Sequence, residues 1–241
     1  MKKLKLIAAI MLLIAPTMQV FADNQKEIEG IRAALAKIIP QNKPDVISPS
    51  HIPGIYEAVF GAQIVYLSAD ARYFIQGDLI DLTTKVNLTE QTRAVQRKKL
   101  VKKMDESTMV VFNPKGKVKH TISVFTDIDC GYCRKLHREM ETYLEKGIKI
   151  RYLSFPRSGP NTKSYFKAIS VWCAKDKQDA MTRSKSGEEL PKADCKHPID
   201  EHMRMAEDFG VSGTPTIVLE NGEVIPGYVP AERLEKILKD V

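Results

Sequence analysis

Residues 123–137, SVFTDIDCGYCRKLH, decide how this chain folds. A run rich in apolar and β-branched residues gives way here to a segment whose apolar residues recur at helical spacing. The pattern predicts a strand over residues 120–128 and a helix from Cys133 to Lys146, with Cys130 and Cys133 at the junction. Two cysteines so placed could close a disulfide, hold a metal ion or react.

The start of a helix favours a reactive pair. Unpaired backbone N–H groups and the helix dipole stabilise negative charge there, so a cysteine at that position has a lowered thiol pKa and more thiolate. We therefore predict that Cys130 is an exposed nucleophile and that Cys133, one turn later on the inner side of the helix, is the resolving thiol. Gly131 is expected to permit a tight turn, and Tyr132 to contribute to the surface and the redox potential.

A zinc site and an inert disulfide are both less favoured than a reactive pair. A structural zinc site needs about four ligands, and the sequence offers no second Cys-x-x-Cys, with His137 as the one nearby candidate for a third ligand. An inert disulfide across two residues would close a tiny loop and stabilise little. Two carboxylates bear on the reactive pair: Asp129 would oppose a thiolate at Cys130, and Asp127 is expected to lie at the surface rather than to accept a proton from Cys133.

The first 22 residues, MKKLKLIAAIMLLIAPTMQVFA, have the pattern of a signal peptide cleaved after about Ala22. The apolar run is short and interrupted for a membrane span, so a cleaved signal peptide is favoured over an uncleaved anchor. The formal net charge is +7, and loss of the three lysines before Asp23 leaves +4, which does not call for nucleic acid as a partner. Outside the cytoplasm disulfides persist, so the four cysteines of the chain, all after Ala22, are expected to form two pairs.

Residues 23–86 predict a small domain. A helical stripe over 23–39 is followed, over 55–82, by short β-branched and aromatic runs typical of an antiparallel meander. A domain of this size often gains burial by pairing with a partner. Residues 87–106 then predict an exposed linker helix, with Asn87 and Glu90 forming a capping-box-like start. Its basic stretch could bind nucleic acid or lipid, but a solvated helix face is favoured.

From residue 108 the pattern becomes mixed. Strand, helix and strand with short joints over 120–156 predict a right-handed βαβ unit with parallel strands. A helix-rich stretch over 166–209 follows, then a hairpin with an Asn221-Gly222 turn and a terminal amphipathic helix. Just before the hairpin, the Thr214-Pro215 bond enters a strand and is a candidate cis peptide.

CGYC on a strand-to-helix turn, with GTPT about eighty residues later, resembles the thioredoxin superfamily. The segments SPSHIPGIYEAVF, FIQGDLIDL, VFTDIDCGYC, FPRSG and VWCAKD resemble the exported disulfide isomerases of the DsbC/DsbG family. The resemblance implies an α+β and α/β fold in four parts. These are a signal peptide (1–22), an N-terminal dimerisation domain (23–86), a linker helix (87–107) and a thioredoxin-like catalytic domain with a helical insertion (108–241).

The resemblance also implies roles for residues. Cys130 would attack and Cys133 would resolve, Thr214 and a cis Pro215 would lie beside them, and Cys173 and Cys195 would form a lasting structural disulfide. From the cysteine count alone, Cys173 and Cys195 could instead be two buried free thiols.

The activity implied is disulfide isomerisation in the periplasm by a homodimer, with accompanying chaperone activity and no cofactor or metal. Its partners would be misfolded exported proteins with non-native disulfides and a membrane reductase of DsbD type. Two rival functions remain: a monomeric periplasmic thiol oxidase or reductase, and a chaperone whose cysteine chemistry is secondary.

Overall fold

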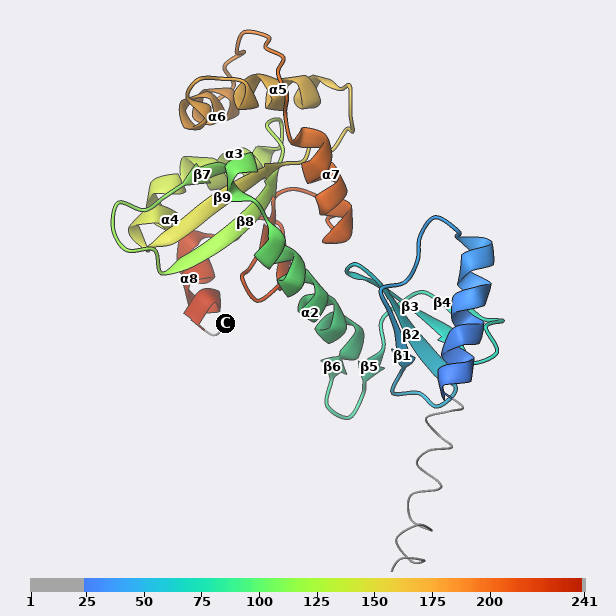
Figure 1. The fold of residues 1–241 in the computed structure, drawn as a ribbon. Helices are drawn as coiled ribbons and strands as arrows, with labels where there is room; N and C mark the ends of the chain where they lie inside the picture. Colours follow the sequence, from blue (N-terminus) through green and yellow to red (C-terminus); the bar gives the residue numbers. More distant parts are fainter. Residues whose placement is uncertain (1–23, 240–241) are drawn as a thin grey trace, which may run out of the picture. The chain divides into compact units, whose positions relative to one another are not determined.

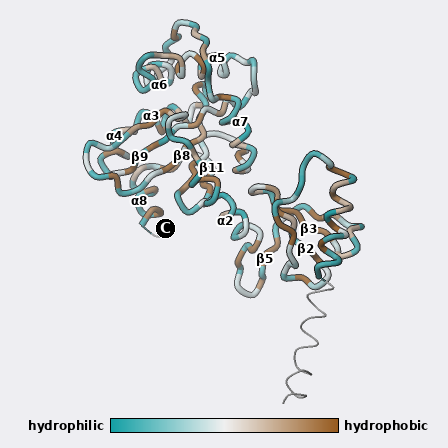
Figure 2. Tube along the Cα trace, in the orientation of Figure 1, coloured by the Kyte–Doolittle hydropathy of each residue, from teal (hydrophilic) through white to brown (hydrophobic). Residues whose placement is uncertain are grey.

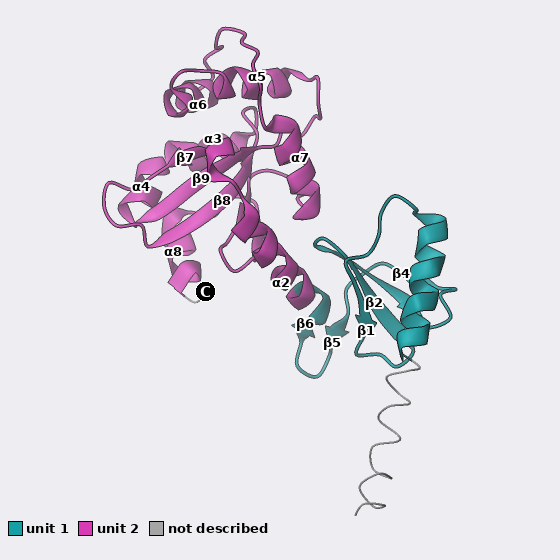
Figure 3. Cartoon of the chain, in the orientation of Figure 1, with its two compact units in different colours: residues 1–90 teal, residues 91–241 magenta. Residues whose placement is uncertain are grey.

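The computed structural model describes residues 24–239, and the predicted signal peptide lies outside them. The chain divides into two compact units, residues 1–90 and residues 91–241 (Figure 3). Each unit has apolar clusters of its own. No helix among residues 24–239 is both long enough and apolar enough to cross a bilayer.

The first unit combines a helix with a small antiparallel sheet, which confirms the predicted helix and meander. Residues 24–38 are helical. The strands pair in sequential order, and β5 and β6 form a separate two-stranded ribbon. Their bounds are β1 Val46–Pro49, β2 Ile55–Phe60, β3 Gln63–Ser68, β4 Phe74–Ile75, β5 Ile80–Asp81 and β6 Val86–Asn87 (Figure 1).

Period-two alternation in this sheet explains its packing. Side chains on one face of β2 and β3, including Tyr56 and Leu67, bury themselves against Ile31 and Leu35 of the N-terminal helix. Figure 2 shows the hydrophobic colour concentrated along β2 and β3. The helix contributes its apolar stripe to this core and leaves its charged side to solvent.

The second unit has a five-stranded sheet of order β11-β10-β8-β9-β7, in which β8 and β9 are parallel and the other pairs antiparallel. The parallel pair confirms the predicted βαβ unit. The helices are α2 Leu88–Lys103, α3 Gly131–Arg138, α4 Met140–Glu145, α5 Lys163–Trp172, α6 Lys177–Lys185, α7 Ile199–Asp208 and α8 Ala231–Lys239. The strands are β7 Val110–Phe112, β8 His120–Thr126, β9 Ile148–Ser154, β10 Thr216–Val218 and β11 Val224–Pro226.

Two apolar layers cover this sheet. On one face, Ile122 and Val124 of β8 pack with residues of α3, α4 and α8. On the other face, Phe125 packs with α7 and with Val101 of α2. Helices α5 and α6 form the helical insertion and lie beside α3 at one end of the sheet (Figure 1). The mixed fold class and the thioredoxin-like second unit are as predicted.

Two predicted helices differ from the structure. The single helix expected from Cys133 to Lys146 is two helices, because Glu139 leaves the helical conformation with φ −95° and ψ 13°. The linker helix α2 is less exposed than predicted. Its Val101 is buried, and the hairpin turn at Gly222 lies so close to Ala94 that only a glycine fits.

Candidate active site

The two cysteines lie where β8 ends and α3 begins. Cys130 occupies the position just before the first helical residue, and its carbonyl accepts a hydrogen bond from the Arg134 backbone at 3.0 Å. Cys133 sits one turn into the helix. Both are free thiols in this structure. The Cys130 sulfur therefore lies at the amino-terminal end of α3, where unpaired backbone N–H groups and the helix dipole favour negative charge.

A second segment closes the site from the far part of the chain. The Thr214-Pro215 peptide bond is cis, and the Cys130 thiol donates a hydrogen bond to the Thr214 carbonyl oxygen at 3.2 Å. The Pro215 carbonyl accepts the Gly227 N–H at 2.8 Å, which ties this segment to the region after β11. The fold thus brings together Cys130, Cys133, Thr214 and Pro215.

Burial of the pair differs from expectation. Cys130 is 3% exposed and Cys133 is 1% exposed, so the predicted exposed nucleophile is wrong. The exposed member of the motif is Tyr132, at 64%. Burial disfavours charge, so any thiolate at Cys130 must be held by specific neighbouring groups.

The pKa values of the two thiols are driven apart. Burial by itself raises the pKa of Cys130, but hydrogen bonding with the Thr214 side chain and with Cys133, and the positive charge of Arg157, lower it below that of ordinary cysteine. Burial raises the pKa of Cys133, and the charge of Lys185 and a hydrogen bond with Thr126 offset only part of this. The first sulfur is thus the more readily ionised.

The carboxylate of Asp129, next to Cys130, is paired. It lies 3.1 Å from Arg134 Nη2 and 2.6 Å from Lys167 Nζ. Two cations close to one carboxylate offset its repulsion of a neighbouring thiolate. The repulsion of a Cys130 thiolate by Asp129, which the sequence predicts, is therefore offset by residues of α3 and α5.

Asp127 is buried at 3% exposure, so the predicted surface role is wrong. Its Oδ2 accepts hydrogen bonds from Arg157 Nε and from the Arg157 backbone N–H, both at 3.1 Å. Sequence reasoning missed Arg157 in this role. A signal existed, because Arg157 follows β9, and the carboxyl ends of parallel β8 and β9 meet at one edge of the sheet.

Three comparisons place this architecture among known proteins. Residues 19–90 match the family model described as the disulfide bond isomerase protein N-terminal domain, and residues 99–241 match the thioredoxin-like domain model. The thiol:disulfide interchange protein DsbC of Escherichia coli K12 is 36% identical over 218 residues, covering 90% of this chain and 89% of the relative. This chain belongs to the DsbC family.

Another DsbC relative, from Haemophilus influenzae, is 38% identical over 197 residues, covering 80% of this chain and 82% of the relative. Among solved structures, the thiol-disulfide exchange protein alpha-DsbA2 of Wolbachia pipientis aligns with a TM-score of 0.50 at 15% identity. That alignment covers 64% of this chain and 99% of the other. At that identity the likeness concerns the fold alone.

In this DsbC-family chain, Gly131 differs from expectation, whereas Tyr132 lies at the surface as predicted. Gly131 has no positive φ, and a Cβ built on it would meet no atom within 4 Å, so the predicted need for a glycine in a tight turn is wrong. Tyr132 stacks on Tyr228 with ring centroids 6.4 Å apart, and Lys135 Nζ lies 4.5 Å from the centre of the Tyr228 ring. These contacts fix an aromatic surface beside the thiols.

The remaining two cysteines are bonded to each other. Cys173 and Cys195 form a disulfide with an S–S distance of 2.04 Å, joining the end of α5 to the segment before α7. The bridge lies within the helical insertion and closes a loop of 22 residues. On the loop-entropy argument, such a bridge stabilises the folded state by about 3 kcal/mol.

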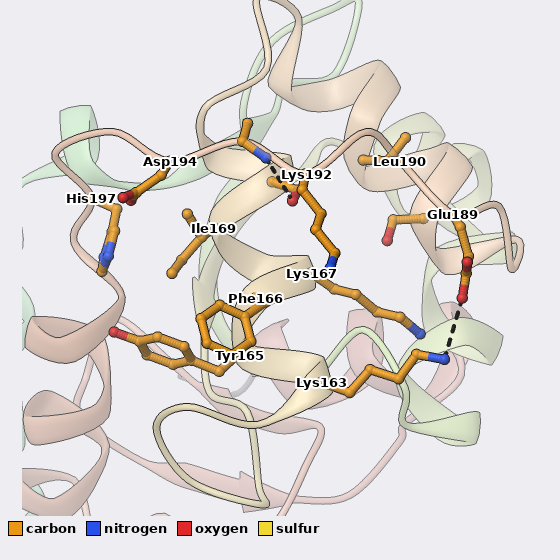
Figure 4. Close-up of a pocket in the computed structure, with 13 residues that line it drawn as sticks. Lys163, Tyr165, Phe166, Lys167, Ile169, Glu189, Leu190, Lys192, Asp194 and His197 are labelled. Atoms are coloured by element: carbon orange, nitrogen blue, oxygen red, sulfur yellow. Dashed lines mark hydrogen bonds and ion pairs between the residues drawn. The ribbon is translucent and has the colours of Figure 1, made fainter.

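A cavity of about 880 Å³ lies beside α5 and contains neither Cys130 nor Cys133 (Figure 4). Tyr165, Phe166 and Ile169 line its apolar part, and Lys163 and Glu189 form an ion pair of 3.2 Å at its edge. Among residues 24–239 there is no group of three or more His, Cys, Asp or Glu side chains placed to hold a metal ion.

Proposed function

We propose that this chain is a periplasmic protein disulfide isomerase that rearranges incorrect disulfides in exported proteins through Cys130 and Cys133. The observation that carries the proposal is the geometry at the start of α3, where one thiol has a lowered pKa and its neighbour a raised one. Membership of the DsbC family, whose relatives are named thiol:disulfide interchange proteins, supports the same activity.

The chemistry follows the usual course of thiol–disulfide exchange. The Cys130 thiolate attacks one sulfur of a substrate disulfide, a mixed disulfide forms, and the second substrate sulfur leaves as thiolate. That thiolate, or another on the substrate, attacks a different sulfur, and Cys130 leaves with its electron pair. When the adduct stalls, Cys133 attacks Cys130, so the Cys130–Cys133 disulfide forms and the substrate departs reduced.

The first unit supports a homodimer. Its edge strand β4 leaves Phe74 and Ile75 58% and 48% exposed, and Tyr73 beside them is also exposed. An unpaired edge strand with exposed apolar side chains is typical of a surface that another chain covers. The match of residues 19–90 to the isomerase N-terminal domain supports the same assignment.

The remaining roles complete the proposal. The signal peptide directs the chain to the periplasm, a membrane reductase of DsbD type returns Cys130 and Cys133 to the dithiol form, and apolar surface on the dimer holds misfolded chains as a chaperone does. The disulfide between Cys173 and Cys195 stabilises the helical insertion and takes no part in exchange with substrate.

Refolding of a scrambled multi-disulfide protein tests the proposal. Cys130→Ala is expected to abolish isomerisation while the variant still suppresses aggregation. Cys133→Ala is expected to retain isomerisation and to accumulate mixed disulfides with substrate. If the Cys130→Ala protein still corrected scrambled bonds, the assigned mechanism would be wrong.

Sedimentation tests the assembly. The reduced protein is expected to sediment as a dimer, and Phe74→Glu to shift it toward monomer because the charge would have to be buried at the interface. Val95→Glu, at an exposed apolar position on α2, is the matched control and should leave the dimer intact. An oxidised monomer for the unaltered chain would favour a thiol oxidase.

A further inference from the structure

Lys185, at the end of α6, is a lysine in a position that suits an apolar residue. It is 3% exposed, and its neighbours Ala180 and Met181 on the same helix are part of the apolar core. Burying an ammonium group costs several kcal/mol unless nearby groups compensate for the lost water. The buried ammonium group of Lys185 therefore needs hydrogen-bond acceptors or a nearby negative charge.

The ammonium group has two hydrogen-bond acceptors. Lys185 Nζ donates to Thr126 Oγ1 at 2.8 Å and to the Asp127 carbonyl oxygen at 3.3 Å. It also lies 5.4 Å from the centre of the Tyr152 ring. Within residues 24–239 no carboxylate forms an ion pair with it. The Asp127 carboxylate is already bound by Arg157.

The charged and titratable groups around Lys185 come from three elements. They are Cys130 just before α3, Cys133, Arg134 and His137 of α3, Asp127 after β8, and Tyr152 of β9. Of these, Cys133 has the largest electrostatic effect on the lysine. A thiolate at Cys133 is therefore the anion that this buried cation is best placed to stabilise.

We propose that Lys185 is a positioning residue for the resolving step, in which its ammonium group, together with the Thr126 hydroxyl, stabilises the Cys133 thiolate as it releases a trapped substrate. The inference rests on the proposed function of the Cys130–Cys133 pair. The helical insertion thereby supplies a charge to the active site from a part of the chain remote from the Cys-x-x-Cys motif.

The hydrogen bonds give this role a route. The Thr126 hydroxyl oxygen accepts a hydrogen bond from Lys185 Nζ, so the hydroxyl proton of Thr126 is free to be donated to another group. Hydrogen bonding with the Thr126 side chain lowers the pKa of Cys133. Cys133 loses its proton, attacks the Cys130 sulfur and forms the Cys130–Cys133 bond. The bond from Cys130 to the substrate sulfur breaks, and that sulfur leaves as a thiolate that takes up a proton, which balances the proton that Cys133 gave up.

The titration behaviour agrees with the geometry. Burial lowers the pKa of Lys185 to about 8, and negative charge on Cys133 raises it. The reciprocal effect is that the lysine charge lowers the pKa of Cys133 against the larger effect of burial. Each group thus favours the ionised form of the other, as linked titrations require.

Reaction of the reduced protein with 5,5′-dithiobis(2-nitrobenzoate) separates the two thiols. Cys130 attacks first and releases one thionitrobenzoate in a bimolecular phase, and Cys133 then displaces the second in a unimolecular phase. Loss of a nearby cation raises a thiol pKa by about one to two units, which lowers the fraction of thiolate. A thiolate of higher pKa is intrinsically more nucleophilic, and this offsets part of the loss in rate. Lys185→Met is therefore expected to slow the second phase about 4- to 13-fold.

The first phase is the internal control, because Lys185 is not among the groups that chiefly lower the pKa of Cys130. It should change less than about twofold, since the interaction of Lys185 with Cys133 is stronger than its interaction with Cys130. Lys175→Met, an exposed lysine of the same insertion, should leave both phases unchanged.

A direct titration provides the second readout. In a Cys130→Ala background with 13C-labelled cysteine, Cys133 is the one free thiol, and Lys185→Met should raise its midpoint by one to two units. Should Lys185→Met fail to fold, Thr126→Val, which keeps the side-chain shape, is expected to slow the second phase in the same way. An unchanged second phase and midpoint would overturn the role of Lys185. Absence of the first phase would instead overturn the proposed function.

Discussion

At the scale of single residues, the site depends on how charge is compensated in a buried place. Cys130 and Cys133 are both nearly inaccessible, yet their surroundings differ. The start of α3 and Arg157 favour a thiolate at Cys130, whereas burial dominates at Cys133. The order of the two pKa values, rather than exposure, distinguishes the thiol that we propose to attack from the thiol that we propose to resolve.

The effect of neighbouring charges on Cys130 leads to a paired prediction. Arg157→Gln removes a cation that lowers the pKa of Cys130, and because Arg157 is partly exposed, water screens the effect to about half a unit to one unit upward. Asp129→Asn should shift it by less than about 0.3 unit, since Arg134 and Lys167 already offset that carboxylate. The rate of iodoacetamide alkylation against pH measures the pKa of Cys130 in both variants. A fall of a full unit in that pKa in Asp129→Asn would contradict the conclusion that Arg134 and Lys167 offset the Asp129 charge.

At the scale of elements, local sequence patterns predicted what local physics determines. The strand before Cys130, the parallel β9, the hairpin and the N-terminal helix all follow from short-range periodicity and turn residues. Asn87 caps α2 as its sequence predicts, accepting the Glu90 N–H at 2.9 Å. The break at Glu139 was missed because the apolar spacing continues through it.

The tightest contact between elements is predicted to be the most sensitive to substitution. Gly222 has φ +90°, and a Cβ there would overlap the backbone of Ala94 and Lys98 in α2. Gly222→Ala should therefore lower the free energy of unfolding by about 3 kcal/mol, of which the positive φ accounts for one to two. Gly116→Ala, with open space and no positive φ, is the control for urea denaturation. Equal free energies of unfolding for the two variants would show that the turn at Gly222 can shift to accommodate a Cβ without loss of stability.

At the scale of the whole molecule, the sequence predicts the active-site segments but does not predict the buried cation that lies near them. The Cys-x-x-Cys pair and the Thr214-Pro215 segment carry recognisable patterns. Lys185 carries none, because α6 has the composition of an ordinary exposed charged helix. Its burial depends on how the insertion packs on the sheet, and no local pattern contains that information.

Buried histidines give the second unit a predicted acid sensitivity. Burial lowers the pKa of His137 and of His202 to about 4 each. Between about pH 6.5 and pH 4 the unfolded chain therefore binds more protons than the folded one, so stability falls as the pH falls, by up to about 3 kcal/mol for each histidine. Denaturation at several pH values measures this loss.

Two variants separate the buried histidines from general acid effects. His202→Asn, which can still accept the Ser154 N–H, should reduce the slope of stability against pH in that window. His51→Gln, at an exposed position, should leave the slope unchanged. Retention of the full slope in His202→Asn would mean that this histidine is not held neutral by the fold.

The measurement that bears most directly on the central claim is the pH dependence of Cys130 alkylation in the fully reduced, full-length protein. Since the pKa of Cys130 is lowered, the rate should reach half its plateau below the value of about 8.5 that is typical of free cysteine, and the protein should stay reactive at neutral pH. A midpoint at or above that of free cysteine would show that the start of α3 does not hold a thiolate, and the proposed isomerase mechanism would lose its basis.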